Sequence, residues 1–218
     1  MTAARLLTIP ESRRSVYGKT PEALAAIYQH DIGMAVWQRQ LDHSLISECE
    51  TLVAETGFSG YRVALPESRL NHLEDAFPKL VAFPQLCADI QLLAEMFCCL
   101  FELKVVGLRL AQLTSAMCPK FHVDRVPCRL ITTYCGGGTQ WLPHHHVNRD
   151  KLGAGNGGRS DADSGLYRST GAIQTLAIGD VALLKGEQWE DNEGAGLVHR
   201  SPRVEAGHQR VLLTLDFA

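Results

Sequence analysis

The sequence has no long apolar run, and this absence bears on where the protein resides. Nowhere do about 18 uninterrupted apolar residues occur, so we expect no transmembrane helix. The stretch Met1–Leu7 is followed at once by Pro10 and by the charge-rich residues 11–14, so it lacks the apolar centre of a secretory signal. We therefore expect a cytoplasmic protein that makes no membrane contact.

The sequence also lacks an excess of basic charge. It contains 21 Lys and Arg residues against 24 Asp and Glu residues, which gives a formal net charge of −3 at pH 7. Proteins that bind the phosphate backbone usually carry a basic surplus on the binding face. We therefore do not expect nucleic acid as a partner.

Paired cysteine motifs are missing as well. The seven cysteines are odd in number and form no C-x-x-C pair, so neither a disulfide framework nor a zinc knuckle is predicted. We expect most of them to be reduced core residues, because a free cysteine packs like a small apolar side chain. As an alternative, one of Cys118, Cys128 and Cys135 points into a metal cavity near His122.

The length of 218 residues fits a single domain, residues 1–218, with enough chain to bury a core. Residues 1–104 are predicted to be mainly helical. A short helix is expected to begin after Thr20 and to end near Tyr28. The other expected elements of this part are a buried strand at Ile32–Trp37, a helix capped by Asp42 or Ser44 that runs to about Glu55 before Gly57, and a long amphipathic helix at Pro84–Leu103.

Residues 105–218 are rich in short apolar runs separated by Gly and Pro, a pattern typical of a sandwich or barrel. The predicted strands are Val105–Leu113, Cys128–Tyr134, Ile173–Ile178, Val181–Leu184, Gly196–His199 and Arg210–Phe217. The Gly-rich stretch between Leu142 and Thr170 is predicted to be a long surface loop. A loop of this length is usually either functional or disordered, and both alternatives stay open.

Three residues form a candidate metal site. His122 and Asp124 stand two positions apart, and side chains at i and i+2 of a strand point to the same side. His199 is expected to join them from a partner strand. Two imidazoles and one carboxylate are the ligand set of non-heme Fe(II) oxygenases. Farther along, Arg210 offers a planar guanidinium suited to a carboxylate co-substrate.

The order of motifs in the second half resembles the 2-oxoglutarate- and Fe(II)-dependent dioxygenases. The motifs are Phe121-His122-Val123-Asp124, the strand Arg129–Tyr134, the turn Gly136-Gly137-Gly138-Thr139, Gly179–Leu184, Val198–Arg203 and Arg210–Leu213. Over most of its length the chain is similar to an uncharacterised bacterial family, domain of unknown function 1826. Genes of that family often neighbour zinc-homeostasis genes.

The resemblance implies a double-stranded β-helix, a jelly-roll barrel, with the N-terminal helices packed against it. It also implies that His122, Asp124 and His199 hold Fe(II) and that Arg210 binds the distal carboxylate of 2-oxoglutarate. Thr132 and Tyr134 would add hydroxyl hydrogen bonds to this co-substrate. Leu212 stands where many dioxygenases of this kind have serine two places after the arginine.

The implied reaction is hydroxylation of a small-molecule or peptide substrate with O₂, and the sequence does not name the substrate. The rim predicted near the site would suit an anionic substrate; its residues are Arg125, Arg129, Trp141, Arg200 and Arg203.

Two alternatives to the oxygenase remain. In one, the same three ligands hold zinc in a cupin-like protein that serves zinc homeostasis without oxidation, since Zn²⁺ binds such ligands more strongly than Fe(II). In the other, the barrel is a protein-interaction module. The run His144-His145-His146 is either a polar loop or a second, looser metal site, in which only His144 and His146 share a side of an extended chain. The sequence does not indicate the oligomeric state.

Overall fold

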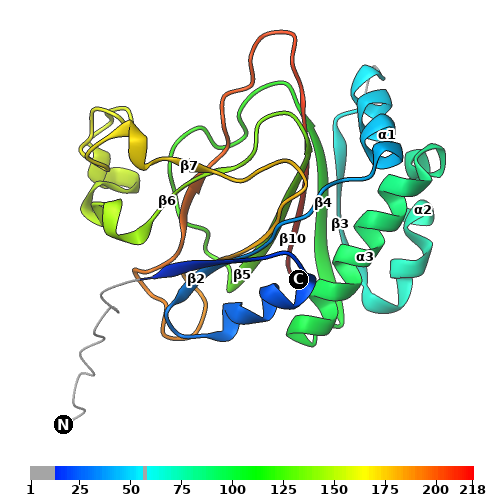
Figure 1. Ribbon diagram of the computed structural model, residues 1–218, viewed down its shortest axis with the longest axis horizontal. Coiled ribbons are helices and arrows are strands. Elements are labelled where there is room, and N and C mark those ends of the chain that lie inside the picture. Colours follow the sequence, from blue (N-terminus) through cyan, green and yellow to red (C-terminus); the bar gives the residue numbers. More distant parts are fainter. Residues whose placement is uncertain (1–12, 56–57) are drawn as a thin grey trace.

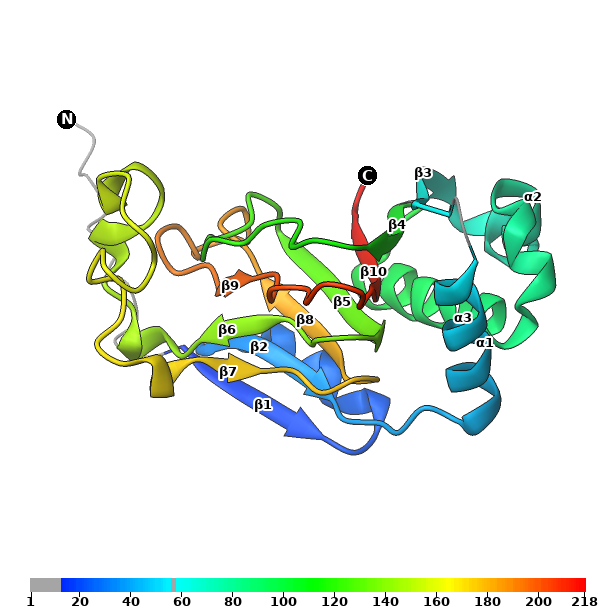
Figure 2. The ribbon, with the colours of Figure 1, turned by 90° about the horizontal axis from the view of Figure 1, so that it is seen from above.

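The computed structural model describes residues 13–55 and 58–218 (Figure 1). A seven-stranded sheet forms the centre of the fold, and a three-stranded sheet lies over part of one face (Figure 2). The protein is of mixed α+β class, as predicted. The expectations for the N-terminal stretch 1–12 and for a helix end at Gly57 lie outside the described residues.

The large sheet has the strand order β1-β2-β8-β5-β10-β4-β3, and only the β1–β2 pair is parallel. Its strands are β1 (Arg14–Gly18), β2 (Ile32–Trp37), β3 (Gly60–Pro66), β4 (Val105–Leu113), β5 (Cys128–Cys135), β8 (Val181–Lys185) and β10 (Arg210–Phe217). The small sheet contains β7 (Gln174–Thr175), β6 (Gln140–Leu142) and β9 (Val198–Arg200), in that order. No strand pairing within the described residues closes the two sheets into a barrel.

Helices cover one face of the large sheet. They are α1 (His43–Ala54), α2 (Leu73–Ala76), α3 (Pro84–Phe101) and the 3-10 helix η1 (Pro21–Tyr28). In α3 the apolar residues recur every three or four positions, so one side of the helix is buried against the sheet. By length and composition α3 is apolar enough to cross a membrane, and six of its 18 residues are buried within the protein.

Two apolar cores lie on opposite sides of the large sheet. In β10 the odd-numbered residues from Val211 to Leu215 belong to the core beneath the helices, and the even-numbered residues from Arg210 to Asp216 face the other way. On that other side, Leu212 joins a smaller core between the two sheets, with Trp141 among the contributions from the small sheet. The polar residues of β10 therefore share the side on which the small sheet lies.

The mainly helical character predicted for residues 1–104 is wrong in one respect, because β1, β2 and β3 all belong to the large sheet. β2 was predicted, whereas β1 and β3 were not. β3 does carry a period-two signal, since Tyr61, Val63 and Leu65 all pack into the core beneath the helices. Short strands of this kind are defined by their sheet partners more than by their own sequence.

Three local predictions also need correction. The segment Pro21–Tyr28 forms a 3-10 helix rather than an α-helix, and the Thr20 side chain makes no capping hydrogen bond. The strand predicted at Ile173–Ile178 is only the two residues of β7. The segment around His122 forms a single β-bridge rather than a strand.

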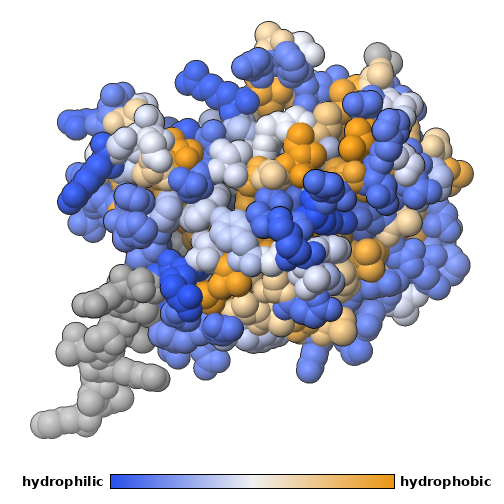
Figure 3. All heavy atoms as spheres, viewed as in Figure 1, coloured by the Kyte–Doolittle hydropathy of each residue, from blue (hydrophilic) through white to orange (hydrophobic). Residues whose placement is uncertain are grey.

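The Gly-rich stretch that follows β6 is folded into short 3-10 turns, among them η4 (His144–His146) and η5 (Arg149–Lys151). Leu166, Tyr167 and Ala172 pack against Phe121 and Val198 in a third apolar cluster. The structure therefore favours an ordered loop over a disordered one. In Figure 3 hydrophilic side chains cover most of the lobe that this stretch forms on the left.

Candidate metal centre

A single antiparallel bridge brings the two predicted histidine ligands together. The amide of His122 donates to the carbonyl of His199 (3.0 Å), and the amide of His199 donates to the carbonyl of His122 (3.0 Å). The imidazole rings lie side by side, with centroids 4.6 Å apart. Asp124 follows two positions later, and the nearest ligand atoms of all three side chains lie within 4.8 Å of one another.

Both imidazoles are oriented by backbone carbonyls. His122 Nδ1 lies 3.0 Å from the carbonyl oxygen of Lys120, and His199 Nδ1 lies 3.1 Å from that of Leu197. A carbonyl only accepts, so each Nδ1 carries the proton, and the lone pair of the neutral ring resides on Nε2. The two Nε2 atoms lie 3.6 and 3.3 Å from the carboxylate of Asp124. Second-sphere hydrogen bonds of this type prepare histidine for a metal ion.

The carboxylate of Asp124 is held in its ionised form. Burial by itself raises its pKa, but the contacts with His122 and His199 and the charge of Arg129 hold the pKa of Asp124 well below its usual range. For His122, burial lowers the pKa, whereas Asp124 and the Lys120 carbonyl raise it by more. Because a histidine ligand must be neutral, protonation of His122 would compete with metal binding, and we expect affinity to increase with pH.

The residues present fit a divalent metal ion. Two imidazole nitrogens and one carboxylate oxygen form the facial set that leaves positions open on Fe(II). Zn²⁺ also accepts these donors. His122, Asp124 and His199 are the only such group of metal-binding side chains among residues 13–55 and 58–218.

Arg129 hydrogen-bonds to the candidate metal-binding carboxylate. Its Nη1 donates to Asp124 Oδ2 (2.8 Å), while its Nε and Nη2 donate to the two oxygens of Asp216 at 2.7 and 2.9 Å. β5 and β10 place Arg129 directly opposite Asp216 in the sheet register. A bidentate ion pair of this geometry holds the guanidinium in one orientation. Arg129, predicted as part of a substrate-binding rim, is thus committed to two carboxylates.

Arg210 is the first residue of β10 and is only 1% exposed. Its guanidinium donates to three hydroxyl groups, those of Ser201 (3.1 Å), Thr133 (2.9 Å) and Thr139 (2.8 Å). Within the described chain it forms no ion pair, and its Nε has no hydrogen-bond acceptor. Burial lowers the pKa of Arg210 to about 10. A buried cation without an anion is costly, so this arrangement favours an anionic ligand at Arg210.

The structure does not bring Thr132 and Tyr134 to this cluster. The hydroxyl of Tyr134 donates to Asp89 Oδ2 (2.7 Å), and its ring belongs to the core beneath the helices. Thr132 lies opposite Leu213, which belongs to the same core. The neighbouring Thr133 faces the other side. Adjacent residues of a strand point to opposite sides, so Thr132 and Tyr134 face away from Arg210. We therefore do not retain them as co-substrate contacts.

Asp161 is a site residue that the sequence prediction missed. Its Oδ2 accepts from the amide of Phe121 (2.9 Å) and from Arg200 Nη1 (3.0 Å). Phe121 directly precedes one histidine ligand, and Arg200 directly follows the other. The only sequence signal was an aspartate within the Gly-rich stretch, which does not indicate its partners. Asp161 thus hydrogen-bonds to both segments that carry the candidate histidine ligands.

The other residues of the predicted rim lie in different environments. Arg200 also donates to Gln140 and covers the ring of Phe121, with its guanidinium 4.2 Å from the ring centroid. Trp141 is buried between the sheets and does not form a rim. Arg125 and Arg203 are exposed.

The histidine run forms the turn η4, and no second metal cluster includes it among residues 13–55 and 58–218. His144 Nδ1 lies 3.2 Å from Arg149 Nη2. Burial, together with the positive charge of Arg149, lowers the pKa of His144 to about 4, so this imidazole stays neutral at physiological pH. The structure favours the polar-loop interpretation of the run.

All seven cysteines are free. Cys128 is buried in the core beneath the helices, Cys135 packs against that core and Cys118 is exposed. None of these three takes part in the candidate metal-binding group. Cys128 and Cys135 fit the expectation of core residues, whereas the exposed Cys118 does not.

The chain belongs to the family described as protein of unknown function (DUF1826), whose sequence model matches residues 18–216. No curated protein matches the sequence significantly.

Among solved structures, the chain is similar to a dioxygenase for auxin oxidation from rice, at 12% identity and a TM-score of 0.49 over 94% of this chain and 82% of that chain. It is also similar to HygX from Streptomyces hygroscopicus with iron bound, at 14% identity and a TM-score of 0.47 over 91% of this chain and 87% of that chain. A third similar structure is a prolyl-4-hydroxylase from Pseudomonas putida, at 16% identity and a TM-score of 0.43 over 90% of this chain and 92% of that chain.

Proposed function

We propose that the protein is a non-heme Fe(II) oxygenase that uses 2-oxoglutarate and O₂ to hydroxylate a small organic substrate in the cytoplasm. The observation that carries the proposal is the pairing of a two-histidine, one-carboxylate cluster with a buried arginine that lacks a carboxylate partner. The cluster supplies a metal face, and the arginine supplies a site for an anion. A metal-binding protein without a co-substrate has no need for the second feature.

The arrangement of strands supports this assignment. Two sheets with a core between them correspond to the architecture that we expect for a double-stranded β-helix. In such a fold the metal ligands lie at one end of the space between the sheets. Ser201, two residues after His199, accepts a hydrogen bond from Arg210 and so connects the metal-binding strand with the proposed anion site.

Each side chain has a defined task in this proposal. His122, Asp124 and His199 would hold Fe(II), Arg129 would keep the Asp124 carboxylate ionised and oriented, and Arg210 would bind the distal carboxylate of 2-oxoglutarate. Bound Fe(II) would supply the O₂ chemistry that converts 2-oxoglutarate into succinate and CO₂ and places the second oxygen atom in the substrate as a hydroxyl group.

The decisive experiment is an anaerobic titration of the metal-free protein with Fe(II) and then with 2-oxoglutarate. We expect the visible charge-transfer band of a bidentate 2-oxoglutarate complex, lost in His199→Ala and weakened in Arg210→Met. Arg168→Met, at an exposed position outside the predicted rim, is the matched control and should leave the band unchanged.

Two results would contradict the oxygenase. Tight Zn²⁺ binding without any band in the Fe(II) titration would favour a zinc-binding protein of zinc homeostasis. Absence of binding of either metal would favour a protein-interaction module. A band of equal intensity in Arg210→Met and in the wild type would remove Arg210 from the co-substrate site.

A further inference from the structure

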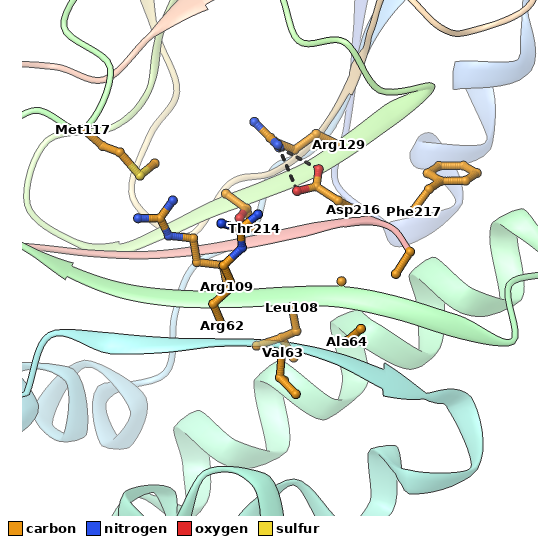
Figure 4. Close-up of a pocket in the computed structure, with 12 residues that line it drawn as sticks. Arg62, Val63, Ala64, Leu108, Arg109, Met117, Arg129, Thr214, Asp216 and Phe217 are labelled. Atoms are coloured by element: carbon orange, nitrogen blue, oxygen red, sulfur yellow. Dashed lines mark hydrogen bonds and ion pairs between the residues drawn. The ribbon is translucent and has the colours of Figure 1, made fainter.

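A hollow with a volume of about 460 Å³ lies over β3, β4 and β10, on the side of the large sheet that carries the polar residues of β10. This volume is in the range of roughly 300–1,000 Å³ that is typical of sites for small organic molecules. Figure 4 shows that the hollow is lined by charged side chains from several strands. Arg62, Arg109, Arg129 and Asp216 line it, together with apolar groups that include Met117 and Phe217.

The sheet register explains why this hollow exists. Ala64 on β3 lies opposite Gly107 on β4, and Gly107 lies opposite Asp216 on β10. Asp216 in turn lies opposite Arg129 on β5. The two small residues leave open space beside the Arg129–Asp216 ion pair. One large side chain at Ala64 would fill that space without changing any charge.

The next row of the sheet places two arginines directly opposite each other. Arg62 on β3 pairs in register with Arg109 on β4, and Arg109 pairs with Thr214 on β10. Both arginines extend into the hollow on the side where Asp216 lies (Figure 4). Like charges in directly opposed positions of a sheet repel each other and destabilise the pair.

No ion pair within the described residues relieves this repulsion. Neither Arg62 nor Arg109 forms an ion pair or a side-chain hydrogen bond there, although the structure pairs many other arginines. The one carboxylate side chain that lines the hollow, Asp216, is already bound at both oxygens by Arg129. The hollow therefore has two uncommitted positive charges beside an apolar surface.

The hollow adjoins the metal centre. Arg129 lines it and also donates to the ligand Asp124. Met117 lines it from the segment that leads to His122. A molecule in the hollow is thus separated from a metal ligand by a single side chain.

From these observations, and on the basis of the function proposed above, we infer that the hollow is the substrate site and that Arg62 and Arg109 bind the carboxylate or phosphate of a small organic anion. The apolar part of the ligand would lie against Met117. The site is separate from Arg210, which serves the co-substrate.

The test measures the binding of phenyl phosphate and of benzoate at millimolar concentration, by calorimetry and ligand-observed NMR. Benzyl alcohol is the uncharged probe. The double variant Arg62→Gln/Arg109→Gln removes both charges, and Ala64→Trp fills the hollow. Arg168→Gln, at an exposed position that does not line the hollow, is the matched control. The two anions distinguish a carboxylate site from a phosphate site.

We expect the wild type and Arg168→Gln to bind at least one anion and to bind benzyl alcohol far more weakly. The double variant should weaken anion binding by roughly tenfold or more, which corresponds to the loss of one strong charge-assisted hydrogen bond. Ala64→Trp should also weaken anion binding, although this substitution leaves the charge of the hollow unchanged. Binding of neither anion by the wild type, or equal affinity in the double variant, would overturn the inference. Loss of binding in Arg210→Met alone would also overturn it.

The same titrations with Fe(II) and 2-oxoglutarate present under anaerobic conditions separate this inference from the proposed function. A charge-transfer band that shifts when the anion binds to the wild type, and not to the double variant, supports both. A charge-transfer band in a protein that binds neither anion would refute the substrate site in the hollow and leave the oxygenase proposal intact. Anion binding that depends on Arg62 and Arg109 in a protein without the band would support an anion site and refute the oxygenase.

Discussion

Arg129 and Arg210 lie on the same side of the large sheet, near opposite ends of β10, and their surroundings differ. Arg129 is held by two carboxylates, Asp124 and Asp216, which satisfy its Nε, Nη1 and Nη2. Arg210 is more deeply buried and contacts only hydroxyl groups. Arginine is therefore fully paired with carboxylates at one end of β10 and has no carboxylate partner at the other end.

The difference indicates what each arginine does. A guanidinium with fixed carboxylate partners has no free charge for a ligand, so Arg129 acts as a positioning residue for Asp124. A guanidinium buried among hydroxyl groups keeps its charge available, because neutral oxygens orient it without neutralising it. Burial without an anion lowers the pKa of Arg210, whereas the carboxylates raise the pKa of Arg129 despite its burial.

The largest effect is expected at the metal ligands that Arg129 supports. His122→Ala, Asp124→Ala and His199→Ala should each abolish stoichiometric Fe(II) binding, because each removes one of three ligands. Metal content after anaerobic loading and gel filtration measures this. His208→Ala, at an exposed position, is the control and should bind like the wild type. Full metal content in a ligand variant would remove that residue from the site.

At the other end of β10, Arg210→Met should weaken 2-oxoglutarate binding by about 10- to 100-fold, as expected when a hydrogen-bonded charge worth about 1.5–3 kcal/mol is lost. Fe(II) binding should be retained. The melting temperature should stay the same or increase, because the variant removes a buried cation that has no anion. A clear loss of stability with unchanged 2-oxoglutarate affinity would instead assign Arg210 a structural role.

Arg129→Met should show the opposite signature. It leaves Asp124 and Asp216 without their cation, so we expect the free energy of unfolding to decrease by about 1.5–3 kcal/mol. Fe(II) affinity should decrease by about tenfold, because the ligand carboxylate loses its second-sphere partner. Denaturant unfolding and competitive metal titration measure the two effects. If Arg129→Met weakened 2-oxoglutarate binding while leaving metal affinity intact, the contrast between the two arginines would be wrong.

The smallest effect is expected at Asp161, which supports the metal ligands through their neighbours. Asp161→Ala should lower the free energy of unfolding by roughly 1–3 kcal/mol, because the buried amide of Phe121 loses its acceptor. Fe(II) affinity should change by only a few fold. Asp161→Asn keeps an acceptor oxygen and should restore most of the stability. Equal stability of Asp161→Ala and the wild type would show that the Gly-rich stretch is fixed without this contact.

Much of the fold was accessible from the sequence where local patterns are strong. The 3.6-residue period predicted α3, and continuous apolar runs predicted β2, β4, β5, β8 and β10 to within a residue or two at each end. β1 and β3 were missed: β1 is short and depends on its sheet partner, whereas β3 carries a period-two pattern that the expectation of a helical N-terminal part overlooked. The spacing of His122 and Asp124 indicated one metal face, and the bridge to His199 brought the third side chain to it.

Sequence alone therefore determined the candidate ligands, their chemistry and the presence of an arginine at the start of the last strand, because these depend on residue type and short spacing. Only the tertiary structure decided which charges are already paired. Asp216 and Asp124 neutralise Arg129, Asp161 joins both ligand segments, and Tyr134 turns away toward Asp89. The physical reason is that ion pairing and burial depend on contacts that sheet register and strand alternation create, most of them between residues tens of positions apart.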